Sequence, residues 1–228
     1  MSTLPLTSDL FSRAASSSFH FNSSSNLLRI ERERANNLGE FLEALRSCPE
    51  ESIFQHTIQT LQEHHYIREG FSNDFAHWAY ANCNEAGLAE RLASIDVRAF
   101  TSISSMREQI IRILEEYFKL NPVSSGRMAL EPFYFCSSQS VVIPTPFAAH
   151  NLREFIEALG KVSVNSIHHH FIQARLRLKL ISNDFSLWLE KEIGLPKTAA
   201  SLNRIDIYTL TLEGVRQQLI RILQSARQ

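Results

Sequence analysis

Residues 37–59 read NLGEFLEALRSCPEESIFQHTIQ, and residues 151–173 read NLREFIEALGKVSVNSIHHHFIQ. The second stretch matches the first without a gap at an offset of 114 residues, and the match extends upstream to Phe19 and Phe133. A match of this length that occurs twice indicates two similar small domains and not an array of short repeats.

The match resumes downstream, after a short insertion in the first copy. Asn-Asp-Phe-x-x-Trp occupies residues 73–78 and recurs at residues 183–188. Arg-x-Gln-x-Ile-Arg-Ile-Leu occupies residues 107–114 and recurs at residues 216–223. Each copy is therefore about 100 residues long, a common size for a domain that buries its own core.

These limits predict the domain organisation. We expect repeat domains at 19–118 and 133–228, with a Ser-rich flexible leader at 1–18. Pro and Gly residues between the copies interrupt helical periodicity, so we expect a linker at 119–132.

Each copy opens with two short apolar segments that polar residues separate. In the first copy these are residues 19–21 and 27–30, and in the second they are residues 133–135 and 141–143. Such a pattern is typical of a small β-hairpin or β-ribbon. We interpret the serines between the segments, at 23–24 and 137–138, as turn residues.

The remainder of each copy is predicted to be helical. Asn37 with Glu40, and Asn151 with Glu154, have the spacing of capping boxes, and apolar residues then recur with helical periodicity. The expected fold class is therefore mainly α (α+β), with two tandem helical-bundle repeats, each opened by a short β-hairpin and related by a pseudo-twofold axis.

Composition excludes some classes of protein. The chain is 44% hydrophobic and 21% charged, with a formal net charge of -1, which disfavours a nucleic-acid partner. No run of apolar residues is long enough to span a bilayer, and the N-terminus does not resemble a signal peptide. Cys48, Cys83 and Cys136 are odd in number and lack CxxC spacing, so we expect reduced thiols in a cytoplasmic protein.

The duplicated polar residues that suggest chemistry are His56 with Asp74 and His170 with Asp184. A histidine and a carboxylate on neighbouring helices are able to bind a divalent metal or to act as a base and its orienting group. The structural alternative is that each imidazole bonds to a group of its own copy while each Asp caps its own helix. We favour the structural alternative, because no third ligand has metal-site spacing.

The other histidines and the tryptophans have simpler interpretations. Residues 168–170 are consecutive histidines, which point in different directions on a helix, so we expect two surface or boundary histidines beside His170. His64, His65 and His77 have no counterpart in the second copy. Trp78 and Trp188 are able to stack on a sugar or base, but their spacing from a Phe predicts buried core positions.

The order of these motifs resembles an uncharacterised prokaryotic family known only as a domain of unknown function. The resemblance rests on Leu-x-Glu-Phe-x-x-x-Leu, Ser-Ile-x-x-His, Asn-Asp-Phe-x-x-Trp, a Leu-Ala element and a final helix with an Arg. These residues are Leu38, Glu40, Phe41, Leu45, Ser52, Ile53, His56, Asn73, Asp74, Phe75, Trp78, Leu88, Ala89 and Arg107, and in the second copy Leu152, Glu154, Phe155, Leu159, Ser166, Ile167, His170, Asn183, Asp184, Phe185, Trp188, Ala199 and Arg216. Thr198 departs from the Leu of the Leu-Ala element. The resemblance implies no catalytic residue.

No catalytic signature, metal ligand set or cofactor motif is evident in either copy. We therefore expect a non-enzymatic binding or scaffolding module with an unknown protein or small-molecule partner. We also expect this module to form homo-oligomers. Two alternatives remain open: a metal-dependent or acid-base enzyme that uses the duplicated His and Asp residues, and a sensor of a small metabolite.

Overall fold

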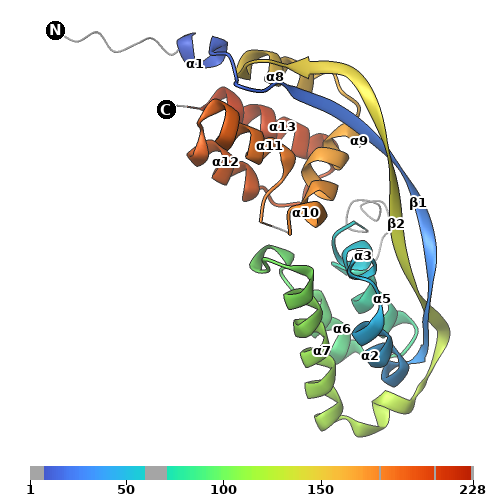
Figure 1. Ribbon diagram of the computed structural model, residues 1–228. Coiled ribbons are helices and arrows are strands. Elements are labelled where there is room, and N and C mark those ends of the chain that lie inside the picture. The colour runs from blue at the N-terminus through green and yellow to red at the C-terminus, as the bar shows by residue number, and fades with distance from the viewer. Residues whose placement is uncertain (1–7, 60–70, 180, 208, 227–228) are drawn as a thin grey trace. The chain divides into compact units, whose positions relative to one another are not determined.

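The computed structural model describes residues 8–59, 71–179, 181–207 and 209–226 (Figure 1). The protein is mainly helical with a small antiparallel sheet, so the expected α+β class is confirmed. The chain divides into two compact units: unit 1 comprises Met1–Ser25 and Val141–Gln228, and unit 2 comprises Asn26–Ser140.

These units differ from the ranges 19–118 and 133–228 that the repeat suggests. Each unit contains the helices of one copy together with the β segment that begins the other copy. Residues 19–25 belong with the second set of helices, and residues 128–140 belong with the first. The two copies therefore exchange their β segments within one chain.

The sheet has two strands, β1 (Phe19–Asn37) and β2 (Met128–Ala149). The side chains of Ser140 and Asn26 are 2.7 Å apart in unit 2, and the Thr145 hydroxyl donates to the Phe21 carbonyl in unit 1. Residue numbers rise on one strand as they fall on the other, so the strands are antiparallel.

The predicted hairpins are wrong. Both apolar segments of a copy lie on one continuous strand, and the neighbouring strand comes from the other copy. The serines at 23–24 and 137–138 lie inside β1 and β2 and not in turns. Ser24 donates to Gln173 and Ser137 donates to Glu31, so these polar residues have partners that allow the strand to continue.

Unit 2 is built around the helices of the first copy. The predicted cap at Asn37 is confirmed, because its side chain accepts the backbone N–H of Glu40, and the side chain of Asn73 accepts that of Ala76. Its helical elements are α2 (Leu38–Ser47), α3 (Glu50–Phe54), the π-helix η1 (Gln55–Gln59), α5 (Asp74–Ala81), α6 (Ala86–Ala93), η3 (Val97–Ala99), α7 (Ile103–Leu120) and η4 (Pro122–Gly126).

Unit 1 has a corresponding order of helices. Asn151 accepts the N–H of Glu154, which confirms its predicted cap, and Asn183 accepts the N–H of Ser186. Its helical elements are α1 (Ser8–Ser12), α8 (Leu152–Leu159), α9 (Val164–Ile167), the π-helix η5 (His168–Gln173), α10 (Ala174–Arg177), α11 (Asp184–Trp188), the π-helix η6 (Leu189–Ile193), α12 (Pro196–Asn203) and α13 (Leu212–Gln224).

Parts of the expected leader and linker have regular structure. Residues 8–12 form α1 and bury Leu10, and the Ala15 N–H donates to the His150 carbonyl at 2.7 Å. Residues 122–126 form η4, and β2 already begins at Met128. The β segments are thus joined to their neighbouring helices by short, ordered connections.

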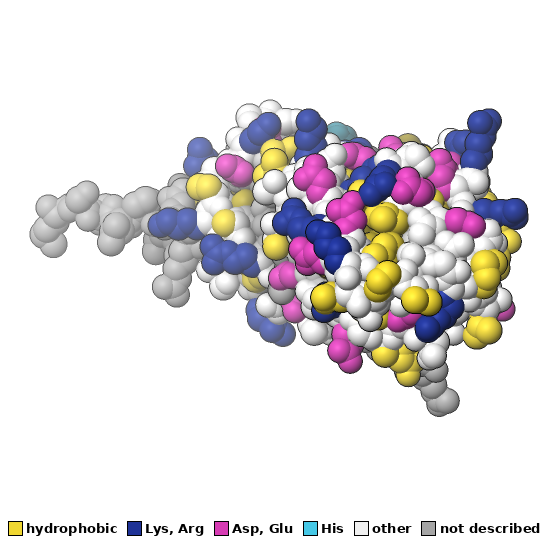
Figure 2. Space-filling model, turned by 90° about the horizontal axis from the view of Figure 1, so that it is seen from below, with side chains coloured by type: hydrophobic (Ala, Val, Ile, Leu, Met, Phe, Trp, Pro, Cys, Tyr) yellow, Lys and Arg dark blue, Asp and Glu magenta, His cyan; other side chains and the backbone are white. Residues whose placement is uncertain are grey.

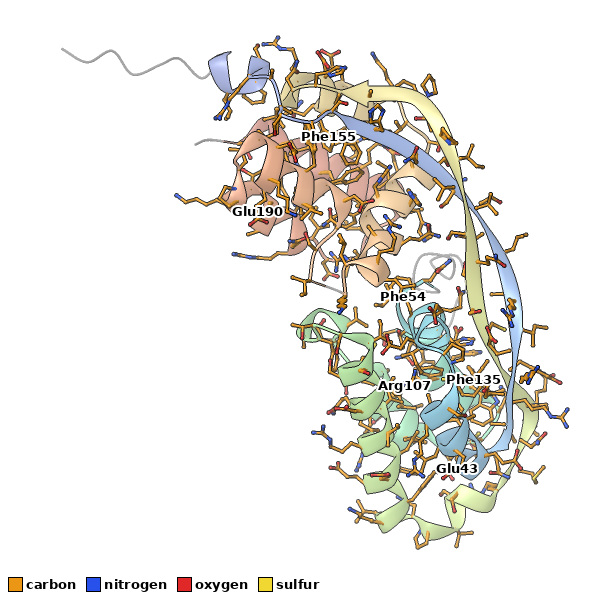
Figure 3. All side chains as sticks on the ribbon, in the orientation of Figure 1. Glu43, Phe54, Arg107, Phe135, Phe155 and Glu190 are labelled. Carbon is orange, nitrogen blue, oxygen red and sulfur yellow. The ribbon has the colours of Figure 1, made fainter. Side chains whose placement is uncertain are left out.

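Aromatic side chains form the core of each unit (Figure 3). In unit 2, Phe133 and Phe135 of β2 contact Phe41 of α2, with ring centroids 5.2 and 5.5 Å apart. In unit 1, Phe19 and Phe21 of β1 contact Phe155 of α8, with both centroid distances 5.2 Å. Complete burial of a phenylalanine contributes about 1.5 to 3 kcal/mol, so each β segment is a substantial part of its core.

The surface is of mixed character. On the face shown in Figure 2, basic and acidic side chains are interspersed, with hydrophobic side chains between them. Among the described helices, none has both the length and the apolar character that a membrane span requires.

Candidate functional site

The structure brings the predicted residues His56 and Asp74 together in unit 2. His56 lies on η1 and Asp74 is the first residue of α5, and the imidazole Nδ1 is 2.8 Å from the Asp74 Oδ2. The other ring nitrogen, Nε2, accepts the backbone N–H of Cys136 at 2.8 Å. Cys136 lies on β2, so His56 connects a helix of the first copy with the strand of the second.

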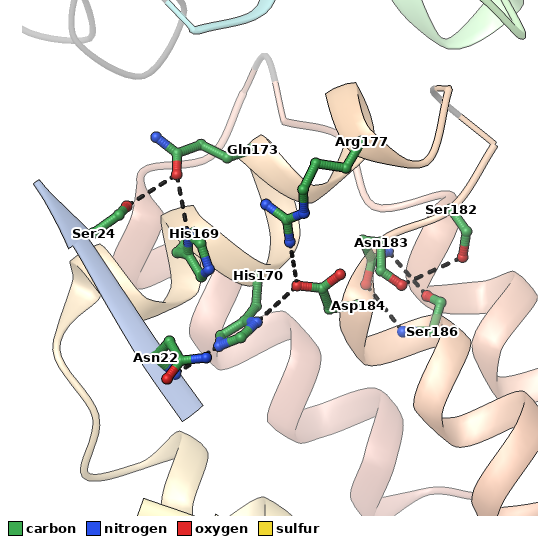
Figure 4. A network of polar contacts seen from close by, with 10 residues as sticks. All are labelled: Asn22, Ser24, His169, His170, Gln173, Arg177, Ser182, Asn183, Asp184 and Ser186. Atoms are coloured by element: carbon green, nitrogen blue, oxygen red, sulfur yellow. Dashed lines mark hydrogen bonds and ion pairs between the residues drawn. The ribbon is translucent and has the colours of Figure 1, made fainter. Parts of the chain in front are cut away.

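His170 and Asp184 form the same arrangement in unit 1 (Figure 4). The Nδ1 of His170 is 2.8 Å from the Asp184 Oδ2, and its Nε2 accepts the Asn22 N–H at 2.7 Å. Arg177 adds an ion pair, with its Nη2 2.7 Å from the same carboxylate oxygen. Here too the strand residue, Asn22 of β1, belongs to the other copy.

These contacts define the protonation state of both imidazoles. A backbone N–H can only donate, so the Nε2 of each ring must carry a lone pair. The proton of a neutral imidazole then lies on Nδ1, from which it is donated to the Asp. Each histidine is therefore held as the neutral Nδ1–H tautomer with both nitrogens engaged.

This arrangement suits anchoring better than catalysis. A general base needs a nitrogen within hydrogen-bond reach of its substrate, and a backbone amide already occupies the Nε2 of His56 and of His170. The amides are outward-facing groups of strands in a two-stranded sheet, which would otherwise lack partners. Each pair thus fastens a strand to its helices.

Two further contacts complete this anchor in each unit. The indole N–H of Trp78 donates to the Glu131 carbonyl, and that of Trp188 donates to the Ser17 carbonyl, both at 2.8 Å. The Gln59 amide donates to the Ser138 hydroxyl at 3.1 Å, and the Ser24 hydroxyl donates to Gln173 at 2.9 Å. We call this set of His, Asp, Trp and Gln contacts the strand anchor.

Sequence reasoning located part of the strand anchor and missed part. The prediction that Trp78 and Trp188 are buried is confirmed, since they are 4% and 6% exposed. The roles of Gln59 and Gln173 were missed, although both glutamines lie in the matched stretches 37–59 and 151–173. An identical buried polar residue in two copies was the signal that could have identified them.

Each histidine bonds to a group of its own copy, the aspartate, as the structural alternative expects. Its other ring nitrogen accepts from the strand of the other copy, because the β segments are exchanged. The side-chain caps of α5 and α11 are Asn73 and Asn183, while the Oδ2 atoms of the neighbouring aspartates accept from histidine.

His168 and His169 are buried, which corrects the expected surface or boundary location. They are 9% and 4% exposed on the π-helix η5, at the positions of Phe54 and Gln55 in unit 2. Burial lowers the pKa of His168 to about 4, and burial together with the nearby His170 lowers the pKa of His169. Both side chains are therefore neutral near pH 7.

His169 lies close enough to the pair for a metal to be considered. Ligand atoms of His169, His170 and Asp184 lie within 4.8 Å of one another. A metal on the Nδ1 of His170 would displace its proton, while the Asn22 N–H still requires a lone pair on Nε2. The ring would then be an imidazolate, or the strand contact would break. The residues present fit a metal poorly for this reason, and the Arg177 guanidinium adds a positive charge at Asp184.

Among the other histidines that the sequence singles out, His64 and His65 lie outside the described residues. His77 lies on α5, and its ring centroid is 6.3 Å from that of Phe71. Within the described part of the chain, His77 belongs to no cluster of potential metal ligands.

The arginine in the last helix of each copy has a structural contact. Arg216 of α13 is buried and donates to the carbonyls of Leu159 and Val162 at the end of α8, both at 2.7 Å. Arg107 of α7 donates more weakly to the Arg46 carbonyl at the end of α2, at 3.4 Å. A cation at the C-terminal end of a helix satisfies free carbonyls and complements the dipole.

Comparison with known proteins places the chain in a family. Residues 16–224 match the family described as "Family of unknown function (DUF5752)", and the chain belongs to it. The expected membership of an uncharacterised family is thereby confirmed. The chain is also similar to a solved structure described as "The structure of OrfY from Thermoproteus tenax", with 29% identity and a TM-score of 0.83. The similarity covers 94% of this chain and 97% of the other. No curated protein matches the chain.

Proposed function

We propose that the protein is a non-enzymatic binding or scaffolding module. The observation that carries this proposal is that both ring nitrogens of His56 and of His170 are engaged by protein groups. The most suggestive chemical residues of the chain therefore serve to hold strands, and the function is left to the surface of the protein.

We further propose that the two copies arose by duplication and are related by a pseudo-twofold axis. The support is that equivalent residues make equivalent contacts in each unit. Trp78 donates to a carbonyl of β2, Trp188 donates to the carbonyl of Ser17 just before β1, both at 2.8 Å, and both histidines lie 2.8 Å from an aspartate. A duplicated frame of this kind suits a scaffold that presents similar elements twice.

The variants His56→Gln and His170→Gln test the non-enzymatic proposal. Glutamine retains an oxygen that can accept the strand amide, but it cannot relay a proton as imidazole does. We expect thermal denaturation to show a modest loss of stability, while binding of a partner identified for the native chain is unchanged. Turnover of a substrate that disappears in either variant while the fold persists would contradict the proposal.

A metal-dependent enzyme is the second candidate, because His169 lies beside the pair in unit 1. The matched test is His169→Gln, which reproduces the Gln55 of unit 2. Elemental analysis of the purified native chain, and thermal shifts with Zn²⁺, Mn²⁺ and Mg²⁺, should show no stoichiometric metal. One equivalent of metal that is lost in His169→Gln would favour the metal-dependent candidate instead.

A further inference from the structure

The two strands have their outer edges covered in different places. In unit 2, helices cover the outer edge of β2: His56 accepts the Cys136 N–H, and the Asn82 carbonyl accepts the Leu130 N–H at 2.9 Å. In unit 1, His170 covers the outer edge of β1 through the Asn22 N–H. This leaves one further edge in each unit: that of β2 in unit 1 and that of β1 in unit 2.

In unit 1 the remaining edge is blocked. Pro144 and Pro146, which share the parity of Cys136 and so stand on the outer edge of β2, lack an N–H. Proline is a common means by which an edge strand avoids pairing with another chain. A further strand cannot form a regular ladder along residues 144–147.

In unit 2 the remaining edge has no such protection. Residues 27–34 contain no proline, and Ile30 and Arg32 stand where β2 has Pro144 and Pro146 at the offset of 114. Among the described residues, no backbone group of residues 27–34 bonds outside the two-stranded sheet. The direction of backbone N–H groups alternates along a strand, so residues of the same parity as Asn22 present theirs on this edge. These residues are Leu28, Ile30, Arg32 and Arg34.

The side chains of this edge specify a partner. Leu28 and Ile30 are 64% and 66% exposed, followed by the exposed residues Arg32 and Arg34. Neither of these arginines forms an ion pair with a carboxylate of the described residues. Alternate residues of a strand share one face, so this row is apolar over two positions and cationic over the next two. A strand laid beside it would gain from apolar residues opposite the first pair and acidic residues opposite the second.

We propose that the β1 edge at residues 27–34 binds an extended acidic polypeptide segment by strand addition. Backbone hydrogen bonds to Leu28, Ile30, Arg32 and Arg34 supply affinity, and the alternating side chains supply specificity. In a segment that pairs antiparallel to β1, the sequence from the N-terminus is acidic-x-acidic-x-apolar-x-apolar, where x is any residue. This inference rests on the proposed binding function and names its partner class.

The test uses the full chain and a fluorescent synthetic peptide, Thr-Glu-Thr-Glu-Thr-Val-Thr-Val-Thr, with a second peptide in which Lys replaces both Glu. We expect the Glu peptide to bind at least tenfold more tightly than the Lys peptide, with affinity that falls as salt rises. Amide hydrogen exchange should slow at residues 28–34 when the Glu peptide is added. Equal binding of both peptides, or protection elsewhere in the chain, would overturn the proposal.

Matched variants test whether peptide binding depends on the β1 edge and not on another part of the protein. Ile30→Pro with Arg32→Pro reproduces the protection of unit 1, and binding should fall at least tenfold. Arg32→Glu with Arg34→Glu leaves the backbone intact, and it should reverse the preference so that the Lys peptide binds more tightly. Pro144→Ile with Pro146→Arg removes the protection of unit 1, and the stoichiometry should rise from one peptide to two. Unchanged binding in the charge-reversed variant would contradict the inference whether or not the proline variant folds.

The outcome separates this inference from the proposed function. If neither peptide binds and the native chain also lacks bound metal and His-dependent turnover, the inference fails while the binding module stands. If His-dependent turnover is found, the proposed function fails whatever the peptides do.

Discussion

The two units share a strand anchor but differ in the residues beside it. In unit 2, Phe54 and Gln55 precede His56, whereas in unit 1 the buried residues His168 and His169 precede His170. The distances from each histidine to its aspartate are nevertheless equal, at 2.8 Å. The contacts that hold the strand are therefore retained while the residues beside them vary, and the two additional histidines next to the anchor lie in unit 1.

The tryptophan of the strand anchor should give the largest effect of any single change. Trp78→Ala and Trp188→Ala each create a cavity and remove the donor to a backbone carbonyl, that of Glu131 in β2 or that of Ser17 just before β1. We expect each to lower the free energy of unfolding by about 3 to 5 kcal/mol in urea denaturation. Similar losses are expected because the two indoles are almost equally buried. If one of the two variants lowered the free energy of unfolding by less than about 1 kcal/mol, the two tryptophans would not have equivalent roles.

Acid should destabilise the protein through His168. Because its folded pKa is about 4, below the ordinary value of 6.5, the unfolded chain takes up a proton first as pH falls. Stability is therefore lost between about pH 6.5 and pH 4, by up to about 3 kcal/mol. The variant His168→Phe, which copies unit 2, should flatten this part of the stability curve measured by chemical denaturation. A curve identical to that of the native chain would show that His168 is not the cause.

Loss of the imidazole should have a smaller effect, similar in the two units. His56→Ala and His170→Ala remove the side-chain acceptor of a strand amide and one of the contacts of an aspartate, which costs about 1 to 3 kcal/mol. The faster exchange of the Cys136 amide in the first variant and of the Asn22 amide in the second should be visible by NMR. Faster exchange of the Asn22 amide in His56→Ala, or of the Cys136 amide in His170→Ala, would contradict the exchanged arrangement.

The helix caps should give the smallest effect. Asn73→Ala and Asn183→Ala remove an acceptor for the first turn of α5 and α11, which costs about 0.5 to 2 kcal/mol. Asn183 also donates to Asn203 and to the Ser186 hydroxyl, and Asn73 also donates to the Leu92 carbonyl and to the Ser72 hydroxyl, so the two losses should be similar. Thermal denaturation of both variants checks this similarity.

Local features were predictable from the sequence, and the exchange of strands was not. Periodicity and capping residues predicted the helices and their first residues, because these signals act within a few residues of chain. Hairpins were predicted because a polar stretch between two apolar segments usually forms a turn. In this protein Ser24 and Ser137 have side-chain partners far away in the sequence, which no local pattern records.

The candidate site, too, was predictable from the sequence only in part. The sequence singled out His56 with Asp74 and His170 with Asp184 as candidate partners because these residues recur in each copy, although the favoured expectation was that each Asp caps its own helix. The second partner of each imidazole is a backbone amide. Because every residue except proline has a backbone N–H, the sequence does not indicate which residue provides it. The burial of His168 was missed because its histidine neighbours suggested a polar face, although it aligns with the buried Phe54.

The exchanged strands are the central claim, and hydrogen-bond couplings measure them most directly. In ¹⁵N-labelled protein near pH 7.5, a coupling across the hydrogen bond should connect the Asn22 amide nitrogen with the His170 Nε2, and the Cys136 amide nitrogen with the His56 Nε2. Both imidazoles should also show the Nδ1–H tautomer. Couplings that instead connect Asn22 with His56 and Cys136 with His170 would contradict the account, because each copy would then hold its own strand.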